Sequence, residues 1–328
     1  MSFEFLISKI QKNNFLLIGR AGVDIYPDPP GTKTENAKSF VTHLGGSSAN
    51  MGVQLTLFGG NCNLLTRVSD DALGRLAINQ LNHYGVKNKL VEFEKNESRI
   101  SFAIVETTVK DHQSIIYRHK ASDLFLNKDD IDNAKIQNFD CILITGTSLA
   151  AEPSRSATLY ALDIANKNNI PVIMDIDYRP YTWESSNKAK EVYNLAASKC
   201  SGVIGNDDEF GVLAGDYNNG LYHAKQLAKN VSLIIYKKGE KGSITFAMNK
   251  EIKKGIFPIK PLKPTGAGDA FMGSLIGSIL KSNDLEKSIE IGSAAAAIVV
   301  TKVGCAPAMP KLNEILEFMK YNKINEGE

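Results

Sequence analysis

The chain has 328 residues, of which 43% are hydrophobic and 23% charged, a composition typical of globular proteins and unlike that of disordered or fibrous ones. Lysine and arginine number 38 against 36 aspartates and glutamates, and this formal net charge of +2 argues against a chain-wide basic surface for nucleic acid or an anionic membrane. No apolar run approaches the ~20 residues of a membrane span, and the N-terminal stretch contains Glu4 and lacks the basic start of a signal peptide.

The first 120 residues are predicted to mix strands and helices. The apolar patterns predict strands at 15–19, 39–44 and 63–68, and helices at 50–58 and 74–84. Alternating residues at 101–108 and 113–119 predict a hairpin with one solvent-facing side, and its turn is expected at Lys110-Asp111-His112.

After about residue 125 the pattern changes to strands and helices in turn. Strands are predicted at 140–145, 171–175, 202–205 and 232–236, and helices at 154–168, 188–197, 221–229, 266–281 and 289–301. This alternation indicates βαβ units and a mostly parallel sheet covered on both faces. We therefore expect one large α/β sandwich with a small β element built from segments near 20–44 and 100–120.

The four cysteines, Cys62, Cys141, Cys200 and Cys305, are spread along the chain. No two are near enough in sequence for a Cys-x-x-Cys site, and a chain of this length does not need disulfides for stability. Together with the absence of a membrane span and a signal peptide, this predicts reduced thiols in a cytoplasmic protein.

A glycine-rich segment, Thr265-Gly266-Ala267-Gly268-Asp269, opens one of the predicted helices. Glycines let a backbone approach an anion, and the free amides at a helix start, together with the helix dipole, hold negative charge. Asp269 would repel such a ligand unless it takes a proton from a hydroxyl group that attacks phosphorus. The alternative is that Asp269 is a first-turn acid that only stabilises its own helix.

The segment Gly45-Gly46-Ser47-Ser48-Ala49-Asn50 also has two interpretations. It predicts a glycine turn followed by a serine N-cap, which is the common reading of such a pattern. Alternatively, the glycines admit a polyol against the backbone and Asn50 bonds to its hydroxyl groups.

Two further motifs follow predicted strands. Asn206 with Glu209 three residues later has the form of a capping box, and it equally fits a pair that holds the water shell of a phosphate-bridging Mg²⁺. The segment Lys237-Lys238-Gly239-Glu240-Lys241-Gly242 follows a buried strand and, taken alone, predicts a plain hairpin turn.

The order of these four motifs along the chain resembles that of the ribokinase-like (PfkB) carbohydrate kinases, from about residue 15 to residue 310. The resemblance implies a three-layer α/β/α sandwich with a mostly parallel central sheet and a small β lid over the sugar. It also implies that residues 1–328 form a single kinase domain whose lid is assembled from segments at about 20–44 and 100–120.

The resemblance implies a role for each motif. Asp269 corresponds to the catalytic base, and the anion hole corresponds to Gly266, Ala267 and Gly268. The residues that would contact the sugar are Asp24, Gly45, Gly46 and Asn50. The nucleotide would lie against Lys237, Gly239 and Gly242, and Mg²⁺ would be held, through water, by Asn206 and Glu209.

Two other stretches, at 117–123 and 175–183, resemble the members of the family that phosphorylate keto-deoxy sugar acids. In those kinases two arginines face the acid end of the substrate, and here they correspond to Arg118 and Arg179. A guanidinium group suits a carboxylate because it can bond both oxygens at once. The alternative is that both arginines form structural or surface ion pairs.

The implied activity is ATP-dependent phosphorylation of the terminal primary hydroxyl of a keto-deoxy sugar acid, with Mg²⁺ as cofactor. The segments at 19–27, 204–210 and 262–266 are most similar to kinases of 5-dehydro-2-deoxy-D-gluconate, an intermediate of inositol breakdown. Kinases of 2-dehydro-3-deoxygluconate and other PfkB sugar kinases are the alternatives. The expected partner is the small sugar acid, with no nucleic acid or membrane, and the resemblance suggests a homodimer formed through the lid.

Two other classes of protein fit the sequence less well. A non-catalytic sugar-acid sensor should have lost the base or the anion hole, and both are intact. A dinucleotide-dependent dehydrogenase should have Gly-x-Gly-x-x-Gly after its first strand, which this chain lacks.

Lys263 departs from the family pattern. Many ribokinase-like enzymes have an aspartate six residues before the catalytic aspartate, where it helps to bind an activating monovalent cation. A lysine ammonium has three donors and no lone pair, so it cannot ligate potassium. We expect Lys263 to take the place of that cation, bonding carbonyls such as those near Gly304 and supporting the anion-hole loop, so that no monovalent cation is required. The alternative is that Lys263 points to solvent.

Overall fold

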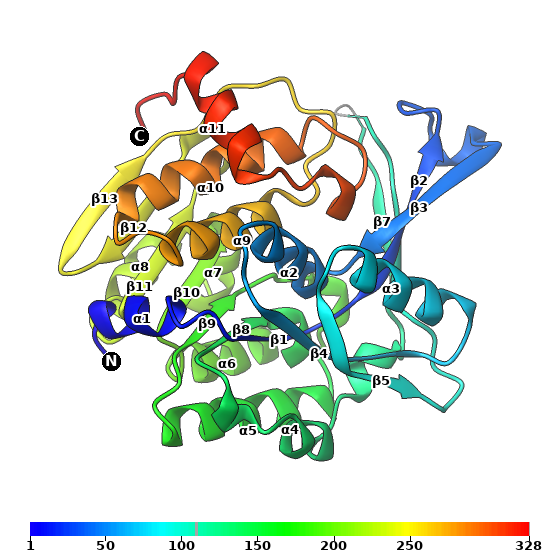
Figure 1. Cartoon of the computed structure of the whole chain (residues 1–328), viewed down its shortest axis with the longest axis horizontal. Helices are drawn as coiled ribbons and strands as arrows, with labels where there is room; N and C mark the ends of the chain where they lie inside the picture. The colour runs from blue at the N-terminus through cyan, green and yellow to red at the C-terminus, as the bar shows by residue number, and fades with distance from the viewer. Residues whose placement is uncertain (109–110, 328) are drawn as a thin grey trace.

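The computed structural model describes residues 1–108 and 111–327, and its core is a nine-stranded sheet between two layers of helices (Figure 1). The strand order is β13-β12-β11-β10-β9-β8-β1-β4-β5. The parallel strands are β1 (Phe15–Ile18), β4 (Cys62–Ser69), β5 (Lys87–Glu94), β8 (Cys141–Thr145), β9 (Val172–Asp175), β10 (Gly202–Asn206) and β11 (Leu233–Lys237). At one edge, β12 (Ser243–Ala247) and β13 (Lys250–Lys254) continue the sheet in antiparallel pairing.

The helices form two layers because successive residues of a strand point to opposite faces of the sheet. Phe15 and Leu17 of β1 pack into one apolar cluster, whereas Leu16 and Ile18 pack into the other. The first cluster includes α1 (Phe3–Ile10), α2 (Ser47–Leu57), α3 (Ala72–His83), α9 (Ala267–Ile279), α10 (Leu285–Val299) and α11 (Leu312–Tyr321). The second includes α4 (Lys128–Ala134), α5 (Ser154–Lys167), α6 (Ser186–Ala197), α7 (Asp207–Ala214) and α8 (Gly220–Leu227).

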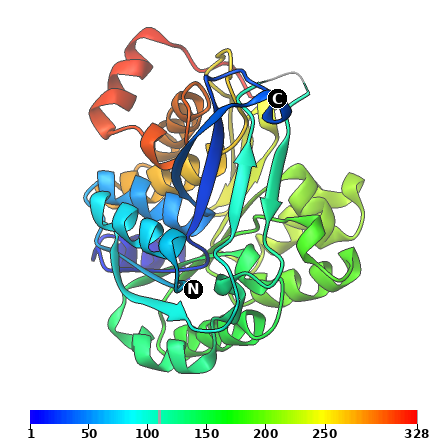
Figure 2. The ribbon, with the colours of Figure 1, turned by 90° about the vertical axis from the view of Figure 1, so that its right-hand side faces the viewer.

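A second sheet of four strands projects from the layered core (Figures 1 and 2). Its order is β3-β2-β6-β7, with β2 (Gly22–Asp28), β3 (Ser39–Gly45), β6 (Phe102–Val105) and β7 (Ser114–Tyr117). It therefore combines two segments that are far apart in the sequence, near 20–44 and 100–120. The β6–β7 pair is antiparallel, as predicted, whereas Lys110 of the predicted turn lies outside the described residues.

The predicted fold class is confirmed, and most predicted elements lie within a few residues of their expected bounds. The elements that were not predicted are α1, α4, α7, α11, β5 and the β12–β13 pair. The four cysteines are buried free thiols, as expected. None of the helices described is long and apolar enough to cross a membrane.

Candidate active site

The predicted functional residues gather at one edge of the large sheet. The parallel strands of that sheet end side by side, with Arg20 two residues beyond β1, Asp175 at the end of β9, Asn206 at the end of β10 and Lys237 at the end of β11. Ligands of open α/β sheets bind outside these carboxyl ends. The smaller sheet adds Asp24 from β2, and α2 and α9 add Asn50 and Asp269.

The glycine-rich segment forms the start of α9. Gly266 is the N-cap in a left-handed conformation with φ of 88°, and a Cβ there would lie 3.0 Å from Cys305 Sγ. A residue with a side chain would therefore be both strained and crowded at this position. Ala267 and Gly268 begin the helix, and the amides of a first turn have no acceptor within the helix, so they are free to bind an anion.

Asp269 lies in the first turn of α9 and meets α2 through a hydrogen bond. Asn50 Nδ2 donates to Asp269 Oδ2 over 2.9 Å, and Asn50 is buried with its Oδ1 lacking a partner among the described residues. Burial raises the pKa of Asp269 to about 7, and the charge of Asp177 adds to this rise while the bond from Asn50 opposes it. A carboxylate that titrates near neutral pH is suited to accept and release a proton.

Lys237 and Asp175 lie beside the anion-hole segment. A Cβ at Gly268 would lie 3.4 Å from Lys237 Nζ and 3.9 Å from Asp175 Oδ2, and the two charged groups are 4.0 Å apart. Although burial opposes its charge, the carboxylates of Asp175 and Glu209 raise the pKa of Lys237. A lysine held charged at this place adds positive potential next to the amides of α9.

The hairpin predicted at 237–242 is formed, since β11 and β12 are antiparallel and Lys237 pairs with Ser243. Gly239 and Gly242 have φ of 57° and 87°, so the turn uses left-handed positions that favour glycine. A Cβ at Gly239 would meet no atom within 4 Å, which leaves open space beside this turn.

Asn206 and Glu209 form the predicted capping box at the start of α7. Asn206 Oδ1 accepts from Glu209 N over 2.8 Å, and Glu209 Oε2 accepts from Asn206 N over 2.7 Å. The other oxygen of Glu209 accepts from Tyr178 N over 3.2 Å. Burial raises the pKa of Glu209 to about 7, and the neighbouring charge of Asp175 adds to the rise. The cap and a role toward a ligand are compatible, because each carboxylate oxygen has a further lone pair.

The segment that follows Gly45 and Gly46 differs from the predicted serine N-cap. Helix α2 begins at Ser47 rather than at Asn50, and its N-cap is Gly46, with φ of 91°, and not a serine. Ser47 Oγ instead donates to Asp177, and Ser48 Oγ lies 3.0 Å from Thr145 Oγ1. The serine N-cap prediction is therefore wrong, because these hydroxyl groups bond to other strand ends instead of capping their own helix.

Asp24 lies on β2, and close packing against β3 requires the glycine at position 45. A Cβ at Gly45 would overlap the Asp24 carboxylate. Asp24 is buried, and Tyr26 Oη, on the same face of the strand, donates to its Oδ2 over 3.4 Å. Burial raises the pKa of Asp24 to about 6, an effect that the Arg20 charge opposes.

Arg118 and Arg179 each have a carboxylate partner. Arg118 is buried, with Nε and Nη2 bonded to Asp123 and Nη2 also donating to Thr147 O over 2.9 Å. Arg179 Nη2 lies 2.7 Å from Asp177 Oδ1, and its side chain is 41% exposed. Arg118 Nη1 and Arg179 Nε are buried atoms without a partner among the described residues. Both arginines thus form ion pairs and still have donors left for a ligand.

Lys263 is completely buried, so the solvent-facing alternative is excluded. Its Nζ donates to Thr265 O over 2.6 Å and lies 3.5 Å from Val299 O. The carbonyls it bonds therefore come from the anion-hole segment and the end of α10, and not from the turn near Gly304. Burial lowers the pKa of Lys263, an effect opposed by Cys305 and by the carboxylates of Asp24 and Asp269.

Arg20, Ser47, Asp175 and Asp177 also lie at this edge of the sheet, although the sequence pattern predicted no ligand or catalytic role for them. Asp177 accepts a hydrogen bond from Ser47 and forms an ion pair with Arg179. Although burial opposes its ionisation, the charges of Arg179 and Arg20 hold its pKa below the usual range. The signal available in the sequence was position, because Arg20, Asp175 and Asp177 lie at the end of a strand or within two residues of it and Ser47 follows a glycine turn.

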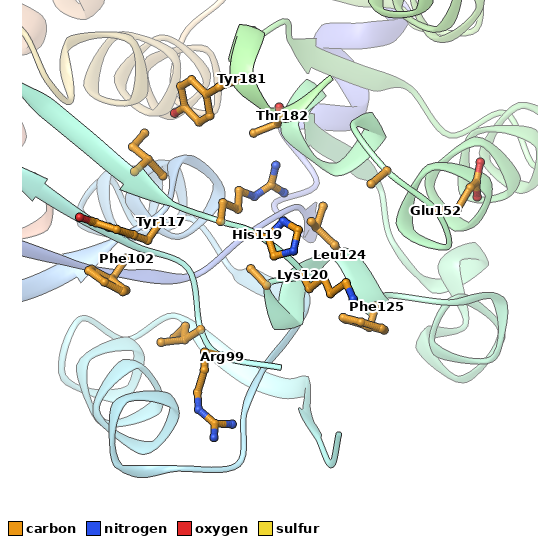
Figure 3. A pocket seen from close by; sticks show the side chains of 15 residues that line it. Arg99, Phe102, Tyr117, His119, Lys120, Leu124, Phe125, Glu152, Tyr181 and Thr182 are labelled. Carbon is orange, nitrogen blue, oxygen red and sulfur yellow. The ribbon is translucent and has the colours of Figure 1, made fainter. Parts of the chain in front are cut away.

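A cavity of about 630 Å³ opens beside the edge strand of the smaller sheet. Its lining includes Tyr117 and Arg118 of that region, Tyr181 and Thr182, and Arg99. In the view of Figure 3, Tyr181 and Thr182 lie across the cavity from Arg99. Apart from Arg118, no predicted site residue lines it, so this cavity adjoins the candidate site and does not contain Asp269.

Comparison with known proteins gives a consistent picture. Residues 12–312 match the family described as pfkB family carbohydrate kinase. The chain is 35% identical over 311 residues to a 5-dehydro-2-deoxygluconokinase of Photobacterium profundum, covering 93% of this chain and 94% of that protein. It is 33% identical over 317 residues to a protein of the same name from Geobacillus kaustophilus, covering 94% of each.

Two solved structures share the fold at lower identity. A double mutant of Vibrio cholerae fructokinase, bound to fructose, ADP and potassium, has a TM-score of 0.81 at 22% identity and covers 93% of this chain and 98% of its own. An Escherichia coli structure described as a putative ribokinase II, in complex with ATP and Mg²⁺, has a TM-score of 0.84 at 20% identity, covering 94% and 99%.

Proposed function

Because the chain belongs to the pfkB family of carbohydrate kinases, we propose that it transfers the γ-phosphoryl group of ATP to the terminal primary hydroxyl of a keto-deoxy sugar acid. The observation that carries this proposal is the meeting of Asp269, Asn50 and the glycine-rich start of α9 at the carboxyl edge of the sheet. The substrate we propose is 5-dehydro-2-deoxy-D-gluconate, which the names of the relatives support.

In this mechanism Asp269 accepts the proton of the attacking hydroxyl group while Asn50 holds the carboxylate in place. Nucleophilic attack is in line with the bond that breaks, so the oxygen of the sugar gains the phosphoryl group and ADP leaves. The amides of Gly266, Ala267 and Gly268 stabilise the charge that develops on the transferring group. Lys237 adds positive charge beside them. Gly239 leaves open space for the nucleotide, while Gly242 lets the same turn pack closely on the carbonyl oxygen of Lys254.

The residues present fit a Mg²⁺ ion held through water. Within residues 1–108 and 111–327, no three His, Cys, Asp or Glu side chains are grouped so that they could hold a metal directly. Glu209 and Asn206 offer oxygens beside Asp175, which suits an ion that keeps most of its own water ligands. When bound, Mg²⁺ would neutralise charge on the phosphates.

The smaller sheet is proposed to act as a lid over the sugar, with Asp24 facing the substrate and the whole chain forming one kinase domain. A lid that excludes water would limit wasteful hydrolysis of ATP. The exposed apolar side chains of Phe40, Ile115 and Tyr117 on this sheet are consistent with the predicted homodimer, which stays a prediction.

The buried ammonium of Lys263 supports the proposal that the enzyme requires no monovalent cation. The ammonium group donates to the carbonyl oxygens of Thr265 and Val299 in a buried region, where an acceptor without a donor is costly. The bond to Thr265 O holds the segment that leads into the anion hole.

The substrate is tested by measuring ADP release from ATP across a panel of sugars. We expect the highest kcat/KM with 5-dehydro-2-deoxygluconate, a lower value with 2-dehydro-3-deoxygluconate, and much lower values with neutral sugars such as fructose and ribose. A preference for 2-dehydro-3-deoxygluconate or for a neutral sugar would support the corresponding alternative. A protein that binds sugar acids without releasing ADP would instead be the non-catalytic sensor.

The pH dependence of turnover tests the base. Asp269 must be ionised to accept a proton, so kcat should fall about tenfold per pH unit below a pKa near 7. Replacing Asn50 by alanine removes a bond that stabilises the ionised form, and the acidic limb should therefore shift to higher pH. A limb that stays in place in the Asn50→Ala enzyme would assign it to another group, of which Glu209 is the first to consider.

A further inference from the structure

Near the candidate site, the buried guanidinium group of Arg20 forms no ion pair with any of the described residues. Arg20 is only 8% exposed, and it has neither a hydrogen-bond acceptor for Nε nor an ion-pair partner among the described residues. Buried arginines are normally paired, because an isolated charge loses its hydration without compensation. The buried Arg155 follows that rule, with Glu184 3.4 Å away, and so does the partly buried Arg67, which pairs with Glu94 and Asp130.

The main chain fixes Arg20 at the substrate side of the sheet. It follows β1, and its carbonyl oxygen accepts from Ala49 N over 3.3 Å at the start of α2. Gly46, with φ of 91°, packs on the same carbonyl so closely that a Cβ would overlap it. The loop that carries Arg20 is therefore packed against the segment 45–50 and leads directly into β2, which carries Asp24.

Arg20, Arg118 and Arg179 share this region, and only Arg118 and Arg179 form ion pairs with a carboxylate of the described residues. Asp123 compensates Arg118, and Asp177 compensates Arg179. The acids that face Arg20 are Asp24 and Asp177. Burial raises the pKa of each, the positive charge of Arg20 lowers it, and neither acid forms an ion pair with Arg20. The charge of Lys263 also lowers the pKa of Asp24, and Asp177 already accepts a hydrogen bond from Ser47 and forms an ion pair with Arg179.

We propose that Arg20 is the principal ligand of the substrate carboxylate, with the unpartnered donors of Arg118 and Arg179 completing the acid-binding subsite. This inference rests on the proposed function and deepens it, because it assigns recognition of the acid to a residue outside the two family arginines. The planar guanidinium of Arg20 can bond both carboxylate oxygens, whereas Arg118 and Arg179 have already committed part of theirs to Asp123 and Asp177. Asp269 would then receive the hydroxyl at the other end of the sugar chain.

Arg20→Met tests this proposal, because methionine keeps much of the length of the side chain and removes its charge and donors. The comparison uses the sugar acid and the matching neutral sugar in which CH₂OH replaces the carboxylate. We expect the ratio of kcat/KM, acid over neutral, to fall about 10- to 100-fold, mainly through KM for the acid. Arg20→Lys keeps the charge but not the two-pronged bond, so its ratio should lie between those of Arg20→Met and the wild type.

A binding measurement separates this role from a structural one. The increase in unfolding temperature that the sugar acid produces should be lost in Arg20→Met, while the increase produced by ADP is retained. If Arg20 only neutralises Asp24 and Asp177, Arg20→Met should lower kcat/KM equally for the acid and the neutral sugar, and Arg20→Lys should restore both values. That outcome would overturn the proposal. Arg67→Met is the matched control, since it breaks a structural pair and should lower stability without changing the acid-to-neutral ratio.

Different results would contradict the proposed substrate class and the proposed role of Arg20. A wild-type enzyme that does not phosphorylate sugar acids contradicts the proposed substrate class. A wild-type enzyme that prefers the acid, together with an Arg20→Met variant that keeps the wild-type ratio and the acid-induced stabilisation, contradicts the role of Arg20 alone.

Discussion

Asp269→Asn should lower kcat by about 10²- to 10⁴-fold, the range that general-base catalysis contributes, with little change in the affinity for nucleotide. The asparagine keeps the size of the side chain, and its amide oxygen can still accept the hydrogen bond from Asn50. What it loses is the ability to take a proton. Single-turnover measurement of phosphoryl transfer, together with titration of ADP binding, checks both parts of this expectation.

Stability distinguishes catalysis from the simpler role of a first-turn acid. Burial is the main cause that raises the pKa of Asp269 to about 7. Above that pH the ionised carboxylate destabilises the folded state, and this cost decreases as the pH falls toward the usual pKa of aspartate. Asp269→Asn should therefore be at least as stable as the wild type at pH 8. If Asp269 only stabilises its helix, the Asp269→Asn protein should instead be less stable than the wild type while its turnover stays near normal. That result would contradict the assignment of Asp269 as the catalytic base.

Glu286→Gln is the matched control for Asp269→Asn. Glu286 is an exposed acid in the first turn of α10, where it pairs with Lys254. Its replacement should reduce stability by about 0.3–1 kcal/mol, through the helix dipole and a surface ion pair, and leave kcat unchanged.

The sequence was sufficient to predict the central strands and the helices between them, because buried parallel strands are short apolar runs bounded by glycine or polar residues. Two of the three strands of the large sheet that were not predicted, β5 and β13, are its edge strands, and the third, β12, lies next to β13. In β5, the sequence Lys87–Glu94 contains charged residues at several positions, and β13, Lys250–Lys254, is almost entirely polar. Edge strands carry such residues because part of their surface faces solvent, which removes the apolar signal.

The candidate site shows a comparable division. Motif residues such as Asp269 and Asn50 could be named because the order of their motifs along the chain resembles that of a known family, and the fold brings them within hydrogen-bond distance. Arg20 could not, because a single arginine after a strand looks the same whether it is exposed or buried. Its significance depends on burial and on the lack of a partner, and both are properties of the packed structure.

We expect the wild type to be equally active with and without potassium and the Lys263→Ala variant to depend on it. The ammonium of Lys263 bonds Thr265 O and lies near Val299 O in a fully buried position, so alanine leaves a cavity lined by carbonyl oxygens. In potassium-free buffer we expect kcat to fall about 10²-fold, at the low end of the range for losing an anion-hole donor, because the segment that carries the amides of α9 loses its support. KM for the sugar should change much less.

Potassium then provides the decisive measurement, because carbonyl oxygens are suitable ligands for a hard cation and the cavity left by Lys263→Ala offers them. Added potassium should restore much of the activity of Lys263→Ala and leave the wild type unchanged. Lys263→Met is the control, since its side chain fills the space without charge, and potassium should not rescue it. Strong activation of the wild type by potassium, or full activity of Lys263→Ala without it, would show that Lys263 does not replace a bound cation.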